Sequence, residues 1–426
     1  MIRIPQHRSP GLSPVRVLMV AIGGYGYYYL RTLLDEVPSE RAVLAGVVDP
    51  LARASRAWPD VEALAVPVCD TVEDFFRTGS AADLAVVASP LHCHVPQSEA
   101  ALAGGADVLC DKPLAVTVQD ARRLMAARDR TGRAVTVGYQ WSFSTAIQRV
   151  KADLLAGVFG QPRRFVTLCA WPRTPAYYAR NSWAGRLRDA QSGALVLDSP
   201  ANNAMAHFLH NACFLLGPAQ ALSAMPVEVT AEFSRANDIE SADTAACRAA
   251  MHGGCEVIFL ASHATAAAVP PCFRIECDEA IITYGSPEPT ITATSRTGAT
   301  RTYGDPDATP QFTKLHAAIA GVPDPLAPLC GIEAAMAQTV CVDAMHESAP
   351  DIVTVPRSLV HTGQDGAVFV EGLDHVLREC FQAARLPHEA GVTWSRPGRP
   401  VSTTSDTRVP GYSPGGSPAC GERPPA

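Results

Sequence analysis

The chain has 426 residues, of which 47% are apolar and 18% charged, so a sizeable buried core and two or three domains are expected. Its formal charge of −7 is spread along the chain without acidic or basic blocks. This distribution argues against nucleic acid or an anionic membrane as a partner and favours small molecules. No segment approaches the roughly 20 unbroken apolar residues of a membrane span.

The cysteines predict a reducing environment. The 13 cysteines are odd in number, form no C-x-x-C pair and lie mostly within apolar runs. This pattern is typical of reduced, buried thiols in a cytoplasmic protein, and not of a disulfide framework. His92 and Cys93 are close in sequence but have no partners at metal-ligand spacing, so no metal site is predicted.

Strands and helices alternate in the first part of the chain. The aliphatic run VRVLMV (15–20) is typical of a strand buried on both faces, and a helix is expected to begin near Gly26. Further strands are predicted at 44–49, 66–69, 83–88, 106–110 and 134–138, with helices at 97–103 and 117–131. This order predicts an α/β domain with a doubly wound parallel sheet over residues 15–142, preceded by a flexible arm at 1–14.

The pattern changes after this domain. A helix is predicted at about 143–156 and a strand at 163–168, and residues 220–284 contain strand-like segments without long helices. We therefore expect an α+β domain with a large, mostly antiparallel sheet over residues 143–392, with helices at 331–347 and 371–385. The end of the chain, 393–426, is rich in Pro, Gly, Ser and Thr and is expected to be disordered.

The turn between the first strand and helix carries the sequence AIGGYG (21–26). Backbone N–H groups and the helix dipole at such a turn can hold a pyrophosphate. The dinucleotide fingerprint is G-x-G-x-x-G, and here Ala21 stands at the first glycine while Gly23 and Gly26 remain. Alternatively, the segment is only a glycine-rich turn.

Asp49 strengthens the dinucleotide interpretation. It ends the second predicted strand 23 residues after Gly26, about where a carboxylate reaches the adenosine ribose hydroxyls of a Rossmann domain. An acidic residue there disfavours a 2′-phosphate, so NAD is preferred over NADP. Arg53 lies four residues later and could accept that phosphate, which leaves NADP open.

Several further motifs follow in a fixed order. They are SPLHCH (89–94), DKP (111–113), VGYQ (137–140), GVFGQPRRF (157–165) and HFLHNACFLLG (207–217). Together with AIGGYG and Asp49 they resemble the Gfo/Idh/MocA oxidoreductases, the family of glucose–fructose oxidoreductase, inositol dehydrogenase and rhizopine-catabolism proteins. The resemblance covers about residues 15–350 and indicates a divergent subgroup with a DSPxNNAxAH segment.

Lys112 is a candidate catalytic residue on grounds of composition and position. The chain has three lysines against 32 arginines, and Lys112 follows the carboxyl end of a predicted buried strand, where doubly wound sheets bind ligands. A lysine there can donate to a substrate oxygen and lower its pKa on burial. The family resemblance implies the same role, with Asp111 in place of the usual glutamate. The alternative is a surface lysine in a loop.

The resemblance assigns cofactor contacts along the first domain. His94 matches the histidine of the family's T-P-x-x-x-H motif, although a structural role at the next helix is an alternative. The predicted cofactor-binding residues are Ala21, Gly23, Gly24, Tyr25, Gly26, Asp49, Ser89, Pro90, His94, Asp111, Lys112 and Gln140.

The segment LDSPANNAMAHFLHN (197–211) carries a dense polar signal in an apolar stretch. On a helix, Asn203, His207 and His210 would share one face, which predicts a substrate-binding seam or, alternatively, a network between packed helices. The resemblance implies that His207 is the acid–base histidine. Two departures are that Asp198 lies nine residues before it, not four, and that His210 occupies the position of the family's aspartate.

The stretch WPRTPAYYARNSWAGRLRD (171–189) combines aromatic and guanidinium groups, which suit a sugar or a carboxylated sugar. An interface loop of an oligomer is an equal alternative. The predicted substrate-binding residues are Arg173, Tyr178, Trp183, Asp198, Asn203, His207 and His210.

The sequence therefore predicts a cytoplasmic NAD(P)-dependent oxidoreductase acting on the hydroxyl or keto group of a sugar, cyclitol or related polyhydroxy compound. A neutral histidine suits the proton acceptor, His207, and a cationic lysine suits the polarising group, Lys112. The alternatives are a glycosidase that uses NAD in a redox cycle and a dinucleotide-sensing regulator without turnover. The resemblance makes a homodimer or homotetramer the expected assembly.

Overall fold

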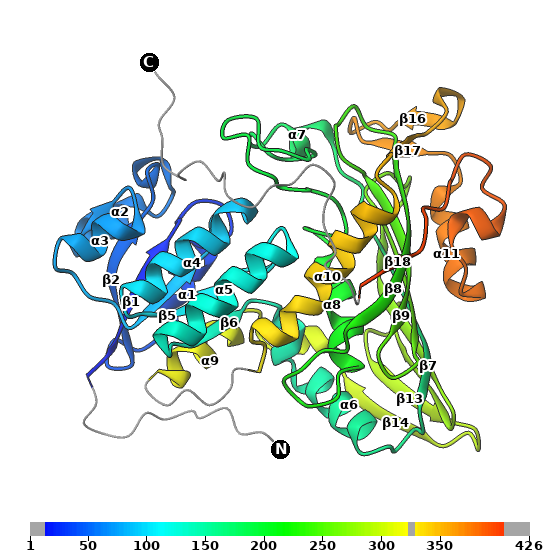
Figure 1. The fold of residues 1–426 in the computed structure, drawn as a ribbon, viewed down its shortest axis with the longest axis horizontal. Coiled ribbons are helices and arrows are strands. Elements are labelled where there is room, and N and C mark those ends of the chain that lie inside the picture. Colours follow the sequence, from blue (N-terminus) through cyan, green and yellow to red (C-terminus); the bar gives the residue numbers. More distant parts are fainter. Residues whose placement is uncertain (1–12, 323–328, 404–426) are drawn as a thin grey trace.

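The computed structural model describes residues 13–322 and 329–403, and two sheets dominate it. Figure 1 shows a smaller sheet with its helices on the left and a large sheet on the right, with helices between them. The predicted fold class, a parallel doubly wound sheet together with a large, mostly antiparallel sheet, is confirmed.

The first sheet has six parallel strands in the order β3-β2-β1-β4-β5-β6. This is the strand order of the doubly wound dinucleotide-binding fold. Strands β2 and β3 extend the sheet on one side of β1, and β4 to β6 extend it on the other. The strands are β1 Val15–Val20, β2 Ala42–Val48, β3 Val68–Cys69, β4 Leu84–Val87, β5 Asp107–Cys110 and β6 Val135–Val137. The helices are α1 Gly26–Asp35, α2 Trp58–Leu64, α3 Val72–Arg77, α4 His94–Ala103 and α5 Val118–Thr131.

Local sequence explains how these elements begin. Four consecutive residues of β4 are buried, as expected for a strand covered on both faces. Thr71 and Thr117 cap α3 and α5, because each hydroxyl accepts the backbone N–H three residues on, from Asp74 and Asp120.

The second sheet has the order β14-β13-β12-β11-β7-β10-β9-β8-β15, with β18 also paired to β8. Most neighbours are antiparallel, and β10 with β7 and β15 with β8 are parallel. Its strands are β7 Pro162–Ala170, β8 Pro226–Arg235, β9 Thr244–Met251, β10 Glu256–Ser262, β11 Val269–Cys277, β12 Ala280–Tyr284, β13 Ile291–Ser295, β14 Thr300–Gly304, β15 Val353–Thr354 and β18 Val401–Ser402. A small hairpin pairs β16 Val360–Thr362 with β17 Val368–Val370.

Helices cover both faces of the large sheet (Figure 1). On the inner side lie α6 Thr145–Leu155, α8 Ala206–Leu215 and α10 Ile332–Ser348, and a short helix, α7 Pro175–Tyr178, lies in the loop after β7. On the outer side, α11 Leu373–Ala383 packs Leu373, Leu377 and Cys380 against apolar residues of β7 and β10.

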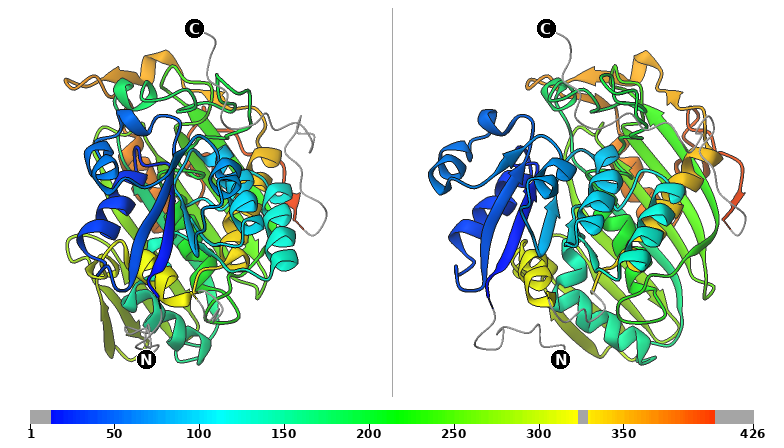
Figure 2. Two further views of the ribbon diagram at one scale, coloured as in Figure 1. Left: turned by 90° about the vertical axis from the view of Figure 1, so that its left-hand side faces the viewer. Right: turned by 60° about the vertical axis from the view of Figure 1, so that its left-hand side comes forward.

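The helix α9, Thr313–Gly321, departs from the predicted domain division. Its residues Leu315, Ala318 and Ile319 belong to the same buried cluster as the apolar residues of β1 and β2. Figure 2 shows it, in yellow, beside the blue strands of the first sheet. The first folding unit therefore includes a helix from far along the chain.

Two terminal predictions need comment. The expected disorder of 393–426 is wrong for its first part, because Val401 and Ser402 pair with β8 and residues up to 403 are described. Residues 404–426 and most of the predicted arm, 1–12, lie outside the described residues.

The cysteines follow the prediction with one exception. Within the described residues, eleven cysteines are free thiols, whereas Cys93 is disulfide-bonded, so the expectation of reduced thiols does not hold for Cys93. Within residues 13–322 and 329–403, no helix is long and apolar enough to cross a membrane.

Candidate active site

The turn after β1 has the backbone geometry of a phosphate-binding loop. Ala21 has φ of 68° and Gly24 of 47°, both in the left-handed region. A Cβ on Gly26 would lie 2.1 Å from the Ala21 carbonyl oxygen, so this position requires glycine for close packing of α1. A Cβ on Gly23 or Gly24 would meet nothing within 4 Å, so open space lies above the turn.

Asp49 lies directly against this turn. Its Oδ2 accepts the backbone N–H of Ile22 at 2.9 Å and its Oδ1 accepts that of Leu51 at 2.8 Å. Each oxygen retains a further lone pair, and the residue is partly exposed. Arg53 stacks on Trp58, with its guanidinium carbon 5.3 Å from the ring centroid.

These residues fit a dinucleotide. The turn is open to solvent at its two central glycines, and α1 begins at Gly26 with its N-terminus at the turn. A carboxylate stands beside the turn at the end of the next strand. This donor set would hold a pyrophosphate at the turn and a ribose at Asp49.

The segment after β4 is held by His94. Its Nδ1 lies 2.7 Å from the carbonyl oxygen of Pro113 and its Nε2 lies 2.9 Å from that of Ser89. The His94 residue is 2% exposed. Its two contacts link the segment after β4 to the segment after β5. The Ser89 hydroxyl donates to Gln97 Oε1 at 2.5 Å, and Pro90 is exposed. The structural alternative for His94 describes these contacts better than direct cofactor binding.

Asp111 and Tyr25 are engaged by a residue that sequence reasoning missed, Lys314 of α9. The Lys314 ammonium lies 3.3 Å from Asp111 Oδ1 and donates to the Gly138 carbonyl at 3.0 Å. It also lies 3.3 Å from the hydroxyl of Tyr25, and Asp111 accepts the hydroxyl of Tyr29 at 2.9 Å. Asp111 is thus committed to an internal ion pair.

Lys112 joins the two sheets through the turn before α8. Its ammonium donates to the Asn203 carbonyl at 2.9 Å and lies 3.3 Å from Asn203 Oδ1. The Asn203 amide in turn donates to Asp198 Oδ1 at 2.8 Å, and Asp198 Oδ2 accepts the Gly185 N–H at 2.7 Å. This series of hydrogen bonds links the Lys112 ammonium to the buried carboxylate of Asp198 and so fixes the orientation of the ammonium.

The charges around Lys112 oppose one another. Burial lowers its pKa, and the charges of Lys314 and Arg180 lower it further, whereas Asp111 and Asp198 raise it. Lys112 has intermediate exposure, in contrast to Lys314. The ammonium is therefore partly desolvated and still held by directed acceptors.

The predicted alignment of Asn203, His207 and His210 on one helical face is wrong for Asn203. Residues 199–205 form turns, and α8 begins only at Ala206, so Asn203 does not share a helical face with His207 and His210. The turn instead lets Asn203 point back to Lys112. Sequence periodicity could not show this, because the polar residues happen to recur at helical spacing.

His207 lies close enough to Lys112 for the two charges to interact. Burial lowers its pKa well below the ordinary value, and the charge of Lys112 is the second cause. Neither ring nitrogen hydrogen-bonds to a described residue, and Nδ1 is buried. The imidazole is thus neutral at neutral pH and has acceptor capacity to spare.

His210 contacts the same Tyr139 ring as His207. Its ring stacks on Tyr139 at 3.8 Å between centroids, its Nε2 lies 2.8 Å from the Ser142 hydroxyl, and it is 1% exposed. Burial lowers its pKa to about 3. His210 therefore belongs to a packed, hydrogen-bonded network, and its role in substrate binding stays a prediction.

The predicted substrate loop runs from β7 to Asp198 and includes α7, near the top of Figure 1. Arg173 and Tyr178 are half-buried, and Trp183 packs beside the cluster of Leu91 and Val116 from the first domain. The side-chain amide of Gln140 lies 3.5 Å from Asp307 Oδ1.

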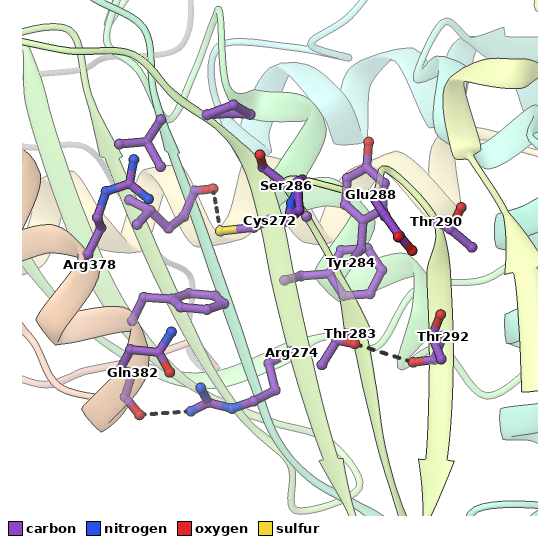
Figure 3. Close-up of a pocket in the computed structure, with 17 residues that line it drawn as sticks. Cys272, Arg274, Thr283, Tyr284, Ser286, Glu288, Thr290, Thr292, Arg378 and Gln382 are labelled. Carbon is purple, nitrogen blue, oxygen red and sulfur yellow. Dashed lines mark hydrogen bonds between the residues drawn. The ribbon is translucent and has the colours of Figure 1, made fainter. Parts of the chain in front are cut away.

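A separate cavity of about 530 Å³ lies on the outer side of the large sheet, between α11 and β11 to β13 (Figure 3). Cys272, Arg274 and Tyr284 line it from the strands, and Arg378 and Gln382 line it from the helix. It contains none of the residues predicted from the sequence.

Two family models match the chain. Residues 15–139 match the oxidoreductase family with an NAD-binding Rossmann fold, and residues 147–283 match the GFO/IDH/MocA C-terminal domain. The two matches correspond to the two sheets described above.

Curated relatives match mainly the first domain. Inositol 2-dehydrogenase 1 of Saccharopolyspora erythraea is 36% identical over 152 residues, which is 35% of this chain and 43% of the relative. The rhizopine catabolism protein MocA of Rhizobium meliloti is 27% identical over 38% of this chain and 49% of its own length. The chain thus spans less than half the length of these relatives.

Solved structures share the whole fold. The WlbA dehydrogenase of Bordetella pertussis, in complex with NADH and UDP-GlcNAcA, is similar with a TM-score of 0.65 and 19% identity, over 79% of this chain and 97% of that one. The aldose-aldose oxidoreductase of Caulobacter crescentus gives a TM-score of 0.63 and 19% identity over 79% and 98%. At this identity the likeness shows the fold.

Proposed function

We propose that this chain, which belongs to the Gfo/Idh/MocA oxidoreductase family, is an NAD-dependent oxidoreductase that acts on a hydroxyl or keto group of a sugar, cyclitol or related polyhydroxy compound. The observation that carries the proposal is the pair of Lys112 and His207. The Lys112 ammonium is held by Asn203 just after β5, and its charge acts on the buried imidazole of His207, whose Nδ1 has no described partner.

His207 is assigned as the proton acceptor. Oxidation of a secondary alcohol requires removal of the hydroxyl proton together with a hydride from carbon. The neutral ring of His207 can take that proton at a nitrogen, since neither nitrogen bonds to a described residue. Its lowered pKa keeps it unprotonated in the resting site.

Lys112 is assigned as the group that polarises the same oxygen. Its ammonium has three donors, and the described acceptors are both on Asn203, so it can also donate to a substrate oxygen. As the hydroxyl loses its proton, the nearby cation stabilises the developing alkoxide. When bound, the nicotinamide supplies the hydride acceptor.

NAD is preferred over NADP in this proposal. The Asp49 carboxylate stands at the glycine turn, where it would accept ribose hydroxyls and repel a 2′-phosphate. Arg53, the residue that could favour the phosphate, is already stacked on Trp58. Assembly as a homodimer or homotetramer and a cytoplasmic location remain proposals, supported only by the family.

The test is a panel of sugars, cyclitols and their acids incubated with NAD or NADP, with reduced nicotinamide followed by absorbance. Lys112→Met is expected to lower kcat/KM by about 10²-fold to 10³-fold, because the alkoxide loses its donor. NAD affinity, measured separately by calorimetry, should change little.

Three results would contradict the proposal. One is turnover by Lys112→Met at near the unmodified rate with NAD still bound, and another is an equal or greater rate with NADP. The third is product formation without net reduction of NAD, which would favour a redox-cycle glycosidase.

A further inference from the structure

Two arginines share one aromatic ring in the loop between β7 and Asp198. The guanidinium carbon of Arg180 lies 3.7 Å from the centroid of the Tyr177 ring, and that of Arg173 lies 4.6 Å from it. Arg173 also lies over the ring of Trp171, at 5.9 Å from its centroid, and Arg180 lies over that of Trp183, at 5.0 Å. Aromatic faces thus fix the orientation of both cations.

Neither arginine forms an ion pair with any residue in the described part of the chain. Arginines of the neighbouring strands behave differently, since Arg163, Arg164 and Arg248 each pair with a carboxylate. In addition, Arg173 Nε is buried without a described partner. The two like charges beside one ring repel each other, and an anion bound between them would relieve this repulsion.

The charges of Arg173 and Arg180 act on a neighbouring histidine, His263. His263, whose ring centroid lies 5.6 Å from that of Tyr177, has its pKa lowered to about 3, first by burial and then by the charges of Arg173 and Arg180. A buried carboxylate whose charge interacts with Arg180, that of Asp198, already accepts two hydrogen bonds, from Gly185 and Asn203. It is therefore engaged as a structural acceptor.

The loop is connected to the proposed reaction centre. Asp198 ends the loop and reaches the ammonium of Lys112 through a single residue, Asn203. The charge of Arg180 contributes to the lowered pKa of Lys112, so the two cations share one region of the site. A substrate bound at Lys112 would have these arginines as its neighbours.

We propose that Arg173 and Arg180 bind an oxyanion carried by the substrate, a carboxylate or a phosphate ester, so that the substrate is an acidic polyhydroxy compound. The proposal rests on the function proposed above and specifies its substrate class. Guanidinium groups match carboxylate and phosphate oxygens with paired N–H donors. Because stacking on Tyr177 holds them in place, little side-chain freedom is lost on binding.

The experiment compares matched neutral and acidic compounds. Glucose is compared with glucuronate and glucose 6-phosphate, and an inositol with its monophosphate, each with NAD. The unmodified protein is expected to show kcat/KM at least about tenfold higher for the acidic members than for the neutral ones. A preference for glucuronate would indicate a carboxylate site, and a preference for glucose 6-phosphate would indicate a phosphate site. Equal or better turnover of the neutral members would overturn the proposal.

Arg173→Gln and Arg180→Gln remove one cation each. Each is expected to lower kcat/KM for the acidic compounds by about 10-fold to 100-fold and to change that for neutral compounds less than about threefold. Arg385→Gln, which removes an exposed arginine after α11, is the matched charge control and should change neither. An equal loss for both compound classes would indicate a structural role and contradict the proposal.

Direct binding separates this inference from the activity. Calorimetry of the protein with NAD and glucuronate or glucose 6-phosphate should give binding that weakens with added salt and with either substitution, even if no compound is turned over. Loss of turnover with retained acid binding would refute only the proposed function. Binding that ignores both arginines would refute the oxyanion site.

Discussion

Ala21 adopts a left-handed backbone at the first residue after β1, with φ of 68°. The fingerprint has glycine here because a Cβ in this conformation approaches the following carbonyl oxygen, at a cost of roughly 1–2 kcal/mol. The chain thus keeps the shape of the dinucleotide turn while lacking its preferred residue. Asp49 helps to hold it, through its bond to the next backbone N–H, of Ile22.

Ala21→Gly is expected to stabilise the protein by about 0.5–1 kcal/mol. The relief of strain exceeds the greater entropy that glycine has in the unfolded chain. Urea unfolding measures the change, and Ala21→Val should shift the midpoint in the opposite direction, because a β-branched residue tolerates positive φ least. A glycine variant less stable than the unmodified protein would show that the turn is unstrained.

For single residues, the sequence predicted which side chains lie at the sheet edge better than it predicted which residues those side chains contact. Asp49 and Lys112 follow apolar strands, so their place at the sheet edge could be predicted from the pattern alone. Asp111 and His94 could not be understood in the same way, because their partners Lys314 and the Pro113 carbonyl come from other segments. The rarity of lysine was a usable signal for Lys314 as well as for Lys112.

Among the elements, α10 and α5 meet at a buried carboxyl. Asp343 of α10 accepts the N–H of Val118, the first residue of α5, at 2.8 Å, and its other oxygen is buried without a described partner. Burial raises the pKa of Asp343 to about 7. The native state therefore holds a proton that the unfolded chain releases, so its stability falls as pH rises from about 4 to about 7.

Asp343→Asn is expected to stabilise the protein above pH 7 by roughly 2–4 kcal/mol, because the amide keeps an acceptor without the buried charge. The gain should disappear towards pH 4, where both forms are neutral. Unfolding midpoints across this range measure it, with the exposed Asp129→Asn as control. A difference independent of pH would mean that Asp343 is ionised throughout.

The elements themselves were predicted where a single pattern decides them. All six strands of the first sheet and β7, β10, β11 and β12 follow from apolar runs. The placement of Asn203 on the helix with His207 was wrong, because Asn203 lies in a turn where it contacts Lys112 from the first sheet and Asp198. The short helix α9 was missed, since its apolar face is defined only by the distant sheet that it covers.

At the scale of the whole molecule, α9 joins the second part of the chain to the first. Lys314 reaches Tyr25 at the glycine turn, Asp111 at the end of β5 and Gly138 at the end of β6. Its side chain is fully buried. One residue from the later part of the chain thus supports three segments of the proposed cofactor site.

Lys314→Met is expected to destabilise the protein by about 3–5 kcal/mol and to weaken NAD binding, because Asp111 is left as an unpaired buried charge. The double variant Lys314→Met with Asp111→Asn should recover most of the stability, since both charges are then absent. Denaturation and calorimetry measure the two effects. Additive losses in the double variant would contradict an ion pair between these residues.

The burial of the lysines has a practical consequence. Lys151 and Lys314 are buried at 0% and 1% exposure, and Lys112 is the only one of the chain's three lysines with intermediate exposure. An amine-directed label applied to the native protein is therefore expected to modify Lys112, in the proposed reaction centre, before Lys151 or Lys314. Covalent probes of the site need no engineered handle.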